Sequence, residues 1–442
     1  MDNVELGLKE TKTQSEAQKD NFYGPDYFAE NDNKNKKMAS KSAVICYGFG
    51  DLASQFIWTF VGSYLTIFYT DVVGLTPIIV SAIMLGARIW DAVNDPLMGA
   101  IAERTRTKWG RFRPYIAFGC PALALFGVMT EDADQRNKIN TSRNIGMNVG
   151  MIIVNSCSAG LALYFSGSGA QVANGYGYMM VALVYSIIAV PLFFVVFFTS
   201  KEYVAPVNNI AKFSFKDTFA NLVHNKYLMI VTGIMALQMT AFMGRIAVCA
   251  FYVIYCLGSF TMIAFIMTIP SIGAVIGSLF VPYLAKKMGK RNVLMYSMLI
   301  QAVGLLVIYL APFDNMTMVI IGCCIFGLFN VGFPMTLSMV ADSVDYMELK
   351  TGIRTDGTAY ATYGLATKVG NALGGSVGVL LLSTFGYVAN AQQTAGALRG
   401  INIVVNLIPA VLFILAAALC LLWKMTDAQA DDIRIALDNK QR

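Results

Sequence analysis

Long apolar runs separated by short polar connections dominate the chain from residue 43 onward. Most of these runs reach the roughly 20 residues that a helix needs to cross a bilayer, and their composition is helical. The pattern therefore predicts an all-α integral membrane protein. Eleven helices are expected, at about 43–70, 76–101, 114–130, 145–165, 176–199, 227–257, 260–285, 293–312, 316–341, 358–387 and 401–424.

Composition narrows the class of protein further. Hydrophobic residues make up 56% of the chain and charged residues 14%, whereas a soluble domain has about a quarter of its residues charged. The net charge of +6 is spread over short loops, which excludes a nucleic-acid partner. The eight cysteines form no CxxC pair, and no Walker A sequence is present. We therefore expect neither an enzyme nor a cofactor, and the only large partner expected is the lipid bilayer.

Lysine and arginine concentrate in the connections 102–113, 200–226 and 286–292, and such loops stay on the cytoplasmic side of a membrane. The chain is expected to begin with a polar cytoplasmic tail (1–42), followed by a helical bundle (43–199). A cytoplasmic linker (200–226) would lead to a six-helix bundle (227–424) and a second cytoplasmic tail (425–442). The sequences KWGR at 108–111 and KMGK at 287–290 follow the second helix of each half, which is typical of a repeated bundle. We expect a monomer in the plasma or inner membrane.

The N-terminal bundle is one span short of an even number. Charged connections flank the run 114–130, which at 1.5 Å per residue reaches only about 25 Å, less than the roughly 30 Å of a hydrocarbon core. This run either dips into the membrane and returns, or it marks a span that was lost. We favour the loss, which gives a two-bundle transporter of the major-facilitator type with about eleven helices instead of twelve.

Ionisable residues inside a membrane are costly and are functional by default. In the second helix Arg88, Asp91 and Asp95 share one face, and Asn94 lies beside the two carboxylates. Asp51 lies about 12 Å from the cytoplasmic end of its helix, Asp91 about 15 Å and Asp95 about 9 Å. Lys368 lies at about 15 Å in a later helix, so these three aspartates and the lysine lie at a similar depth in the membrane.

A depth near the middle of the membrane suits a site that couples a cation to a second ligand. Carboxylate and amide oxygens favour a hard cation such as Na⁺, which Asp91 and Asp95 would ligate, or one aspartate could take up H⁺ instead. The composition does not choose between these ions. The rival interpretation is that Arg88, Asp91 and Lys368 form buried ion pairs that only hold helices together.

Four motifs resemble those of the glycoside-pentoside-hexuronide:cation symporters, the melibiose permease-like family of the major facilitator superfamily. The resemblance extends from about residue 41 to 424, and its longest motif is highly specific. The motifs are ARIWDAVNDPLMG at 87–99, RTRTKWGRFRPY at 104–115, YGFGD at 47–51 and ADSVDY at 341–346.

The resemblance implies symport of a sugar or glycoside with Na⁺ or H⁺ by alternating access. By similarity, Asp91, Asn94 and Asp95 would form the cation site. Asp51 and Arg143 would bind sugar hydroxyls, which fits the charge-assisted hydrogen bonds that these groups make. Lys368 would serve the shared cavity, and Arg88 is expected in a structural ion pair.

One departure from the family pattern leaves alternatives open. The family has a full helix before the charged segment near Glu131, and that helix contributes to both ligand sites, whereas here it is absent or fused into 114–130. The chain is therefore either a working symporter or a membrane protein that retains the fold without transport. A third alternative is a symporter of a non-sugar amphiphile, against which Asp51 and Arg143 argue.

Overall fold

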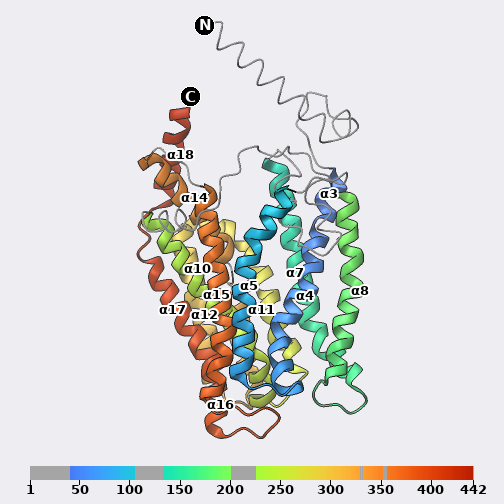
Figure 1. Ribbon diagram of the computed structural model, residues 1–442. Helices are drawn as coiled ribbons and strands as arrows, with labels where there is room; N and C mark the ends of the chain where they lie inside the picture. Colours follow the sequence, from blue (N-terminus) through green and yellow to red (C-terminus); the bar gives the residue numbers. More distant parts are fainter. Residues whose placement is uncertain are drawn as a thin grey trace, which may run out of the picture. The chain divides into compact units, whose positions relative to one another are not determined.

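A computed structural model describes residues 40–104, 133–200, 225–328, 330, 332–351 and 356–441, and within these residues all regular structure is helical (Figure 1). Eight of its helices are long and apolar enough to cross a membrane. The expected all-α membrane fold is confirmed for this part of the chain. The eight candidate spans are Lys41–Val72, Thr141–Ser166, Gly175–Thr199, Lys226–Cys256, Met262–Val281, Lys290–Leu310, Thr358–Thr384 and Ala395–Cys420.

The first part of the chain forms helices up to residue 199. Ser40 caps the first of them by accepting a hydrogen bond from the amide of Ala43. The second candidate run of the sequence, 76–101, is a single long helix that carries the charged residues around Asp91. The helices are α3 (Lys41–Cys46), α4 (Gly48–Ile67), the π-helix η1 (Phe68–Val72), α5 (Pro77–Arg104), α7 (Ala133–Ser166) and α8 (Gly175–Thr199).

The second part starts at Asn225, whose side chain accepts from the amide of Leu228 and so caps the next helix. The expected run 316–341 is divided between a short apolar helix and a more polar one. The helices are α10 (Lys226–Phe251), η3 (Tyr252–Cys256), α11 (Met262–Met288), α12 (Lys290–Leu310), α13 (Met316–Leu328), α14 (Gly332–Thr351), α15 (Asp356–Thr384), α16 (Ala395–Asn402), η4 (Ile403–Leu407), α17 (Ile408–Cys420) and α18 (Asp427–Gln441).

Two expectations of the sequence remain predictions. The run 114–130, where a span is expected to be lost, lies outside the described residues. The chain divides into two compact units, and these do not follow the predicted bundles. Because compactness in one structure does not identify the parts that move, the borders at 43–199 and 227–424 stay predictions. Unit 1 comprises Met1–Ser54, Asp95–Gly150 and Ser186–Asn209, and unit 2 comprises Gln55–Asn94, Met151–Tyr185 and Ile210–Arg442.

Within unit 2, α10 packs against α15 through glycines. A methyl group on Gly374 would lie 2.5 Å from the carbonyl oxygen of Thr240 and 2.7 Å from the amide nitrogen of Gly244. A methyl group on Gly370 would lie 2.6 Å from Cβ of Met239. These glycines allow two backbones to approach closely, as small residues do in membrane helices.

Gly374→Ala is therefore expected to destabilise the protein. The added methyl group has to push α10 away from α15, and overpacking of this kind costs about 1–3 kcal/mol. Thermal unfolding of the purified protein in detergent measures the effect as a lower melting temperature. Gly375→Ala, at the neighbouring position, is a matched control, because a methyl group there would meet nothing within 4 Å. Equal melting temperatures for the two variants would contradict this account of the helix contact.

Candidate substrate and cation site

The side chains of Asp51 and Arg143 form an ion pair between α4 and α7 in unit 1. The Nε of Arg143 donates to Oδ2 of Asp51 at 2.6 Å. The Arg143 side chain is 17% exposed and the Asp51 side chain 21%, so both are largely covered yet reachable. The family resemblance implies that both residues bind sugar hydroxyls, and the structure brings the two charged groups together. A carboxylate beside a guanidinium offers acceptors and donors to adjacent hydroxyl groups.

Glycines hold α4 and α7 close together beside this pair. A methyl group on Gly48 would lie 2.5 Å from the carbonyl oxygen of Ser142, and one on Gly146 would overlap the carbonyl oxygen of Gly48. The hydroxyl of Ser142 also donates to the carbonyl oxygen of Ile45 at 2.8 Å. Because the backbones are this close, the side chains of Asp51 and Arg143 reach each other directly.

The expected cation ligands lie along α5. This helix is unbroken from Pro77 to Arg104, so Asp91, Asn94 and Asp95 share one face, as their spacing predicts. The side chains of Asp91 and Asn94 are half-buried, and the side chain of Asp95 lies outside what the structure describes. The oxygens of Asp91 and Asn94 suit a hard cation. Among the side chains that the structure describes, no three His, Cys, Asp or Glu groups gather as a metal site would.

Arg88 and Lys368 belong to unit 2. The guanidinium of Arg88 lies over the ring of Trp58, 4.8 Å from its centroid, and this cation–π contact joins α5 to α4. Its expected ion pair stays a prediction. Lys368 is half-buried on α15. Because Asp51 belongs to unit 1, the expected meeting of Asp51, Asp91, Asp95 and Lys368 in one pocket also stays a prediction.

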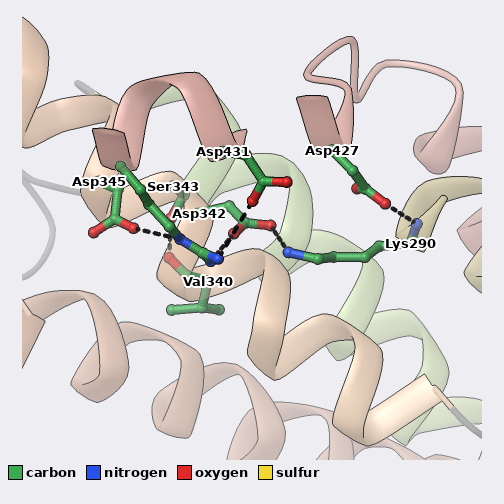
Figure 2. A network of polar contacts seen from close by, with 8 residues as sticks. Lys290, Val340, Asp342, Ser343, Asp345, Asp427 and Asp431 are labelled. Atoms are coloured by element: carbon green, nitrogen blue, oxygen red, sulfur yellow. Dashed lines mark hydrogen bonds and ion pairs between the residues drawn. The ribbon is translucent and has the colours of Figure 1, made fainter. Parts of the chain in front are cut away.

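A second polar cluster joins α12, α14 and α18 (Figure 2). Asp342 on α14 is only 3% exposed, and it accepts from Nζ of Lys290 at 2.5 Å and from Nη2 of Arg434 at 2.7 Å. The backbone amide of Lys290 donates to Asp427, the first residue of α18, at 3.1 Å. Desolvation raises the pKa of Asp342 above its ordinary value, while the positive charges of Lys290 and Arg434 oppose this rise. The segment expected as a polar tail thus contains a helix bound to the bundle.

Asp342→Asn should loosen α18. The amide keeps one acceptor oxygen but removes the negative charge that Lys290 and Arg434 share, and breaking a buried ion pair is strongly destabilising. Hydrogen exchange of the amides at 427–441 should become faster by at least about tenfold, equivalent to about 1.4 kcal/mol. Asp431→Asn is the control, because Asp431 is 70% exposed and 3.7 Å from Arg434. Equal exchange in both variants would show that Asp342 does not hold α18.

Two polar residues that join distant parts of the chain were not predicted from the sequence to have a role. Arg434 was assigned only to a tail, since nothing in its local sequence shows that it meets α14. Asp71 directly follows the expected helix 43–70, in a connection where the sequence predicts no functional residue. An acidic residue at the end of an apolar run was the available signal for Asp71.

Comparisons with known proteins match almost the whole chain. The family described as MFS/sugar transport protein matches residues 46–129 and 118–427. The two stretches overlap at 118–129, within the run where a span is expected to be lost. An isoprimeverose transporter of Lactiplantibacillus pentosus is 30% identical, and the match covers 88% of this chain and 90% of that protein. A putative glycoside/cation symporter, YagG of Escherichia coli (strain K12), is 26% identical, with 88% of this chain and 93% of that protein covered.

Solved structures agree on the fold. A bacterial homologue of the human lysosomal transporter Spinster has a TM-score of 0.54 and 14% identity, covering 87% of this chain and 98% of that one. The nucleoside transporter NupG has a TM-score of 0.53 and 16% identity, covering 87% of this chain and 99% of that one. At these identities the likeness concerns the fold alone, and it is the fold of major-facilitator transporters.

Proposed function

This chain belongs to the MFS/sugar transport protein family and, within it, to the glycoside-pentoside-hexuronide:cation symporters, and from this premise we propose how it moves its solute. It is a membrane transporter and not an enzyme. It carries a sugar or glycoside together with a cation, Na⁺ or H⁺, and needs no other cofactor. It works as a monomer with both termini on the cytoplasmic side.

The ion pair of Asp51 and Arg143 is the observation that carries the substrate assignment. Sugars present adjacent hydroxyl groups, each of which can donate one hydrogen bond and accept others. A carboxylate takes the donated bonds and a guanidinium supplies the donors, and hydrogen bonds to charged groups contribute about 1.5–3 kcal/mol each. A bound sugar would replace part of the contact at 2.6 Å between the two groups. Both side chains are largely covered but still reachable, at 17% and 21% exposed, so a sugar hydroxyl can approach the pair.

The carboxylates of α5 couple the sugar to the cation gradient. A cation held by Asp91, Asn94 and Asp95 adds positive charge to a site that is otherwise negative, and this raises the affinity for the sugar. Coupling is reciprocal, so bound sugar raises the affinity for the cation by the same factor. A gradient of the cation then drives the sugar uphill as the two bundles alternate between the two sides of the membrane.

Uptake by the purified protein in liposomes tests this function. The probes are isoprimeverose, a glucuronide and sulfoquinovose, which the names of related transporters suggest. We expect at least one probe to accumulate under an inward Na⁺ or H⁺ gradient, and to leave when an ionophore collapses that gradient. Uptake at the level of protein-free liposomes for all sugars would support the transport-deficient alternative. Uptake of a lysolipid in place of the sugars would support the amphiphile alternative.

A further inference from the structure

Asp71 is the centre of a polar cluster in unit 2 whose residues belong to neither the candidate substrate site nor the candidate cation site. The hydroxyl of Tyr255 donates to its Oδ2 at 2.6 Å, and the hydroxyl of Tyr387 donates to its Oδ1 at 2.5 Å. Thr70 also donates to Oδ1, at 2.6 Å. The side-chain amide of Asn390 donates to the backbone carbonyl of Asp71 at 2.6 Å. One acidic residue is thus held by three residues that are distant from it in sequence.

The cluster draws on three connections of unit 2. Asp71 lies in η1, which ends α4, and Tyr255 lies in η3, which ends α10. Tyr387 and Asn390 belong to the connection between α15 and α16. Figure 1 shows α16 at the end of unit 2 opposite to α18, and the loop charges predict that the α16 end faces outward.

The local backbone is adapted to these contacts. Both η1 and η3 are π-helical turns, which are rare and occur frequently at functional sites. Asn390 has a φ of +55°, and it is the only non-glycine residue with positive φ in the described part of the chain. Its backbone amide donates to the hydroxyl of Tyr255 at 3.2 Å. Unusual backbone of this kind persists only where the surrounding contacts hold it.

The tyrosine hydroxyls are suited to donate to Asp71. Tyr387 is only 5% exposed. Burial, and then the charge of Asp71, raises the pKa of Tyr387 well above its ordinary value, so the hydroxyl keeps its proton. A carboxylate that accepts from buried hydroxyls is a stronger acceptor than a neutral group would be.

Two further hydrogen bonds join the N-terminal and C-terminal parts of the sequence within unit 2. The hydroxyl of Ser81 on α5 donates to the carbonyl oxygen of Ser376 on α15 at 3.0 Å. The side-chain amide of Asn155 on α7 donates to the hydroxyl of Ser271 on α11 at 3.1 Å. Every one of these contacts has to break if the two halves of the chain separate at the α16 end.

We propose that Asp71, Tyr255, Tyr387 and Asn390 form a latch, the Asp71 latch, which closes the transporter at the α16 end. This proposal rests on the proposed function, because alternating access requires the two halves to part there once in each cycle. The charge of Asp71 strengthens several hydrogen bonds at once, so this single carboxylate sets how often the α16 end opens.

Thiol labelling in detergent tests the latch. The reporter is Ser376→Cys, because Ser376 is buried at the contact with Ser81. A maleimide reagent is added to the full chain, and peptide mass spectrometry follows modification at position 376 alone, so that the native cysteines do not interfere. Asp71→Asn should increase the labelling rate by about tenfold, because the neutral amide loses the charge-assisted bonds. Tyr387→Phe removes one donor and should increase the rate by a smaller factor.

Asp314→Asn is the matched control, since it removes an exposed carboxylate from the connection between α12 and α13. It should leave the labelling rate unchanged, and melting temperatures within about 3 °C of each other would show that the variants are folded. Unchanged labelling in both Asp71→Asn and Tyr387→Phe overturns the latch. The assay needs neither sugar nor gradient, so faster labelling without any sugar uptake overturns the proposed function and leaves the latch standing.

Discussion

Arg143→Ala is expected to abolish sugar uptake. The substitution removes the donors that would hold sugar hydroxyls, and it leaves Asp51 without the partner that lies 2.6 Å away. Hydrogen bonds to charged groups contribute about 1.5–3 kcal/mol each, so losing two of them lowers sugar affinity by at least about a hundredfold. The measurement is sugar binding and uptake in liposomes at matched protein amounts.

Two further variants make this test specific. Arg143→Lys keeps the charge but not the planar group, so it should recover only part of the affinity. Lys138→Ala removes an exposed cation from the same helix, α7, and should transport like the unaltered chain. If Arg143→Ala bound sugar within about twofold of the unaltered chain, a difference well below 1.4 kcal/mol, the substrate assignment would be wrong.

Asp91→Asn is expected to uncouple transport from the cation. Asparagine has nearly the same shape as aspartate and keeps one oxygen ligand, but it lacks the negative charge that would offset the cation's cost of dehydration. Stimulation of sugar binding by Na⁺ or H⁺ should fall by at least about tenfold, the lower part of the usual range of coupling between sites. Asp95→Asn should act in the same way.

Cation titrations of sugar binding measure this effect. With Na⁺ as the coupling ion, the variants lose their response to sodium. With H⁺ as the coupling ion, the amide imitates a permanently protonated carboxyl, and sugar binding loses its pH dependence. Asp314→Asn, which removes an exposed acid, should change neither response. Unaltered cation dependence in both Asp91→Asn and Asp95→Asn would remove these residues from the cation site.

Much of the fold could be predicted from local pattern alone. The length of the apolar runs predicts membrane helices, and the spacing of Asp91, Asn94 and Asp95 places them on one face of a helix that the structure shows to be continuous. Glycines at 370, 374, 375 and 378 in one apolar helix predict close helix packing, and α10 confirms it for Gly370 and Gly374, whereas a methyl group on Gly375 would meet nothing within 4 Å. In these cases the residues involved lie on one helix, so the helical repeat alone determines the pattern.

The features that escaped prediction depend on partners far apart in the sequence. Asp71 meets Tyr255 and Tyr387 across 184 and 316 residues, and Arg434 meets Asp342 across 92. Nothing in the pattern around either residue indicates these partners. The π-helical turns that hold Asp71 and Tyr255 follow ordinary apolar helices, and their residues give no sign of the change. The family resemblance implies that Asp51 and Arg143 each bind sugar hydroxyls, but the ion pair between them was not predicted.

Cation movement driven by a sugar gradient tests symport most directly. Liposomes that contain the protein are given an inward gradient of the transported sugar, with equal Na⁺ and equal pH on both sides. If sugar and cation move together, the sugar gradient alone should drive labelled sodium, or protons, into the liposomes, and Asp91→Asn should abolish that movement. Sugar entry with no accompanying cation movement would contradict symport and reduce the protein to a passive carrier.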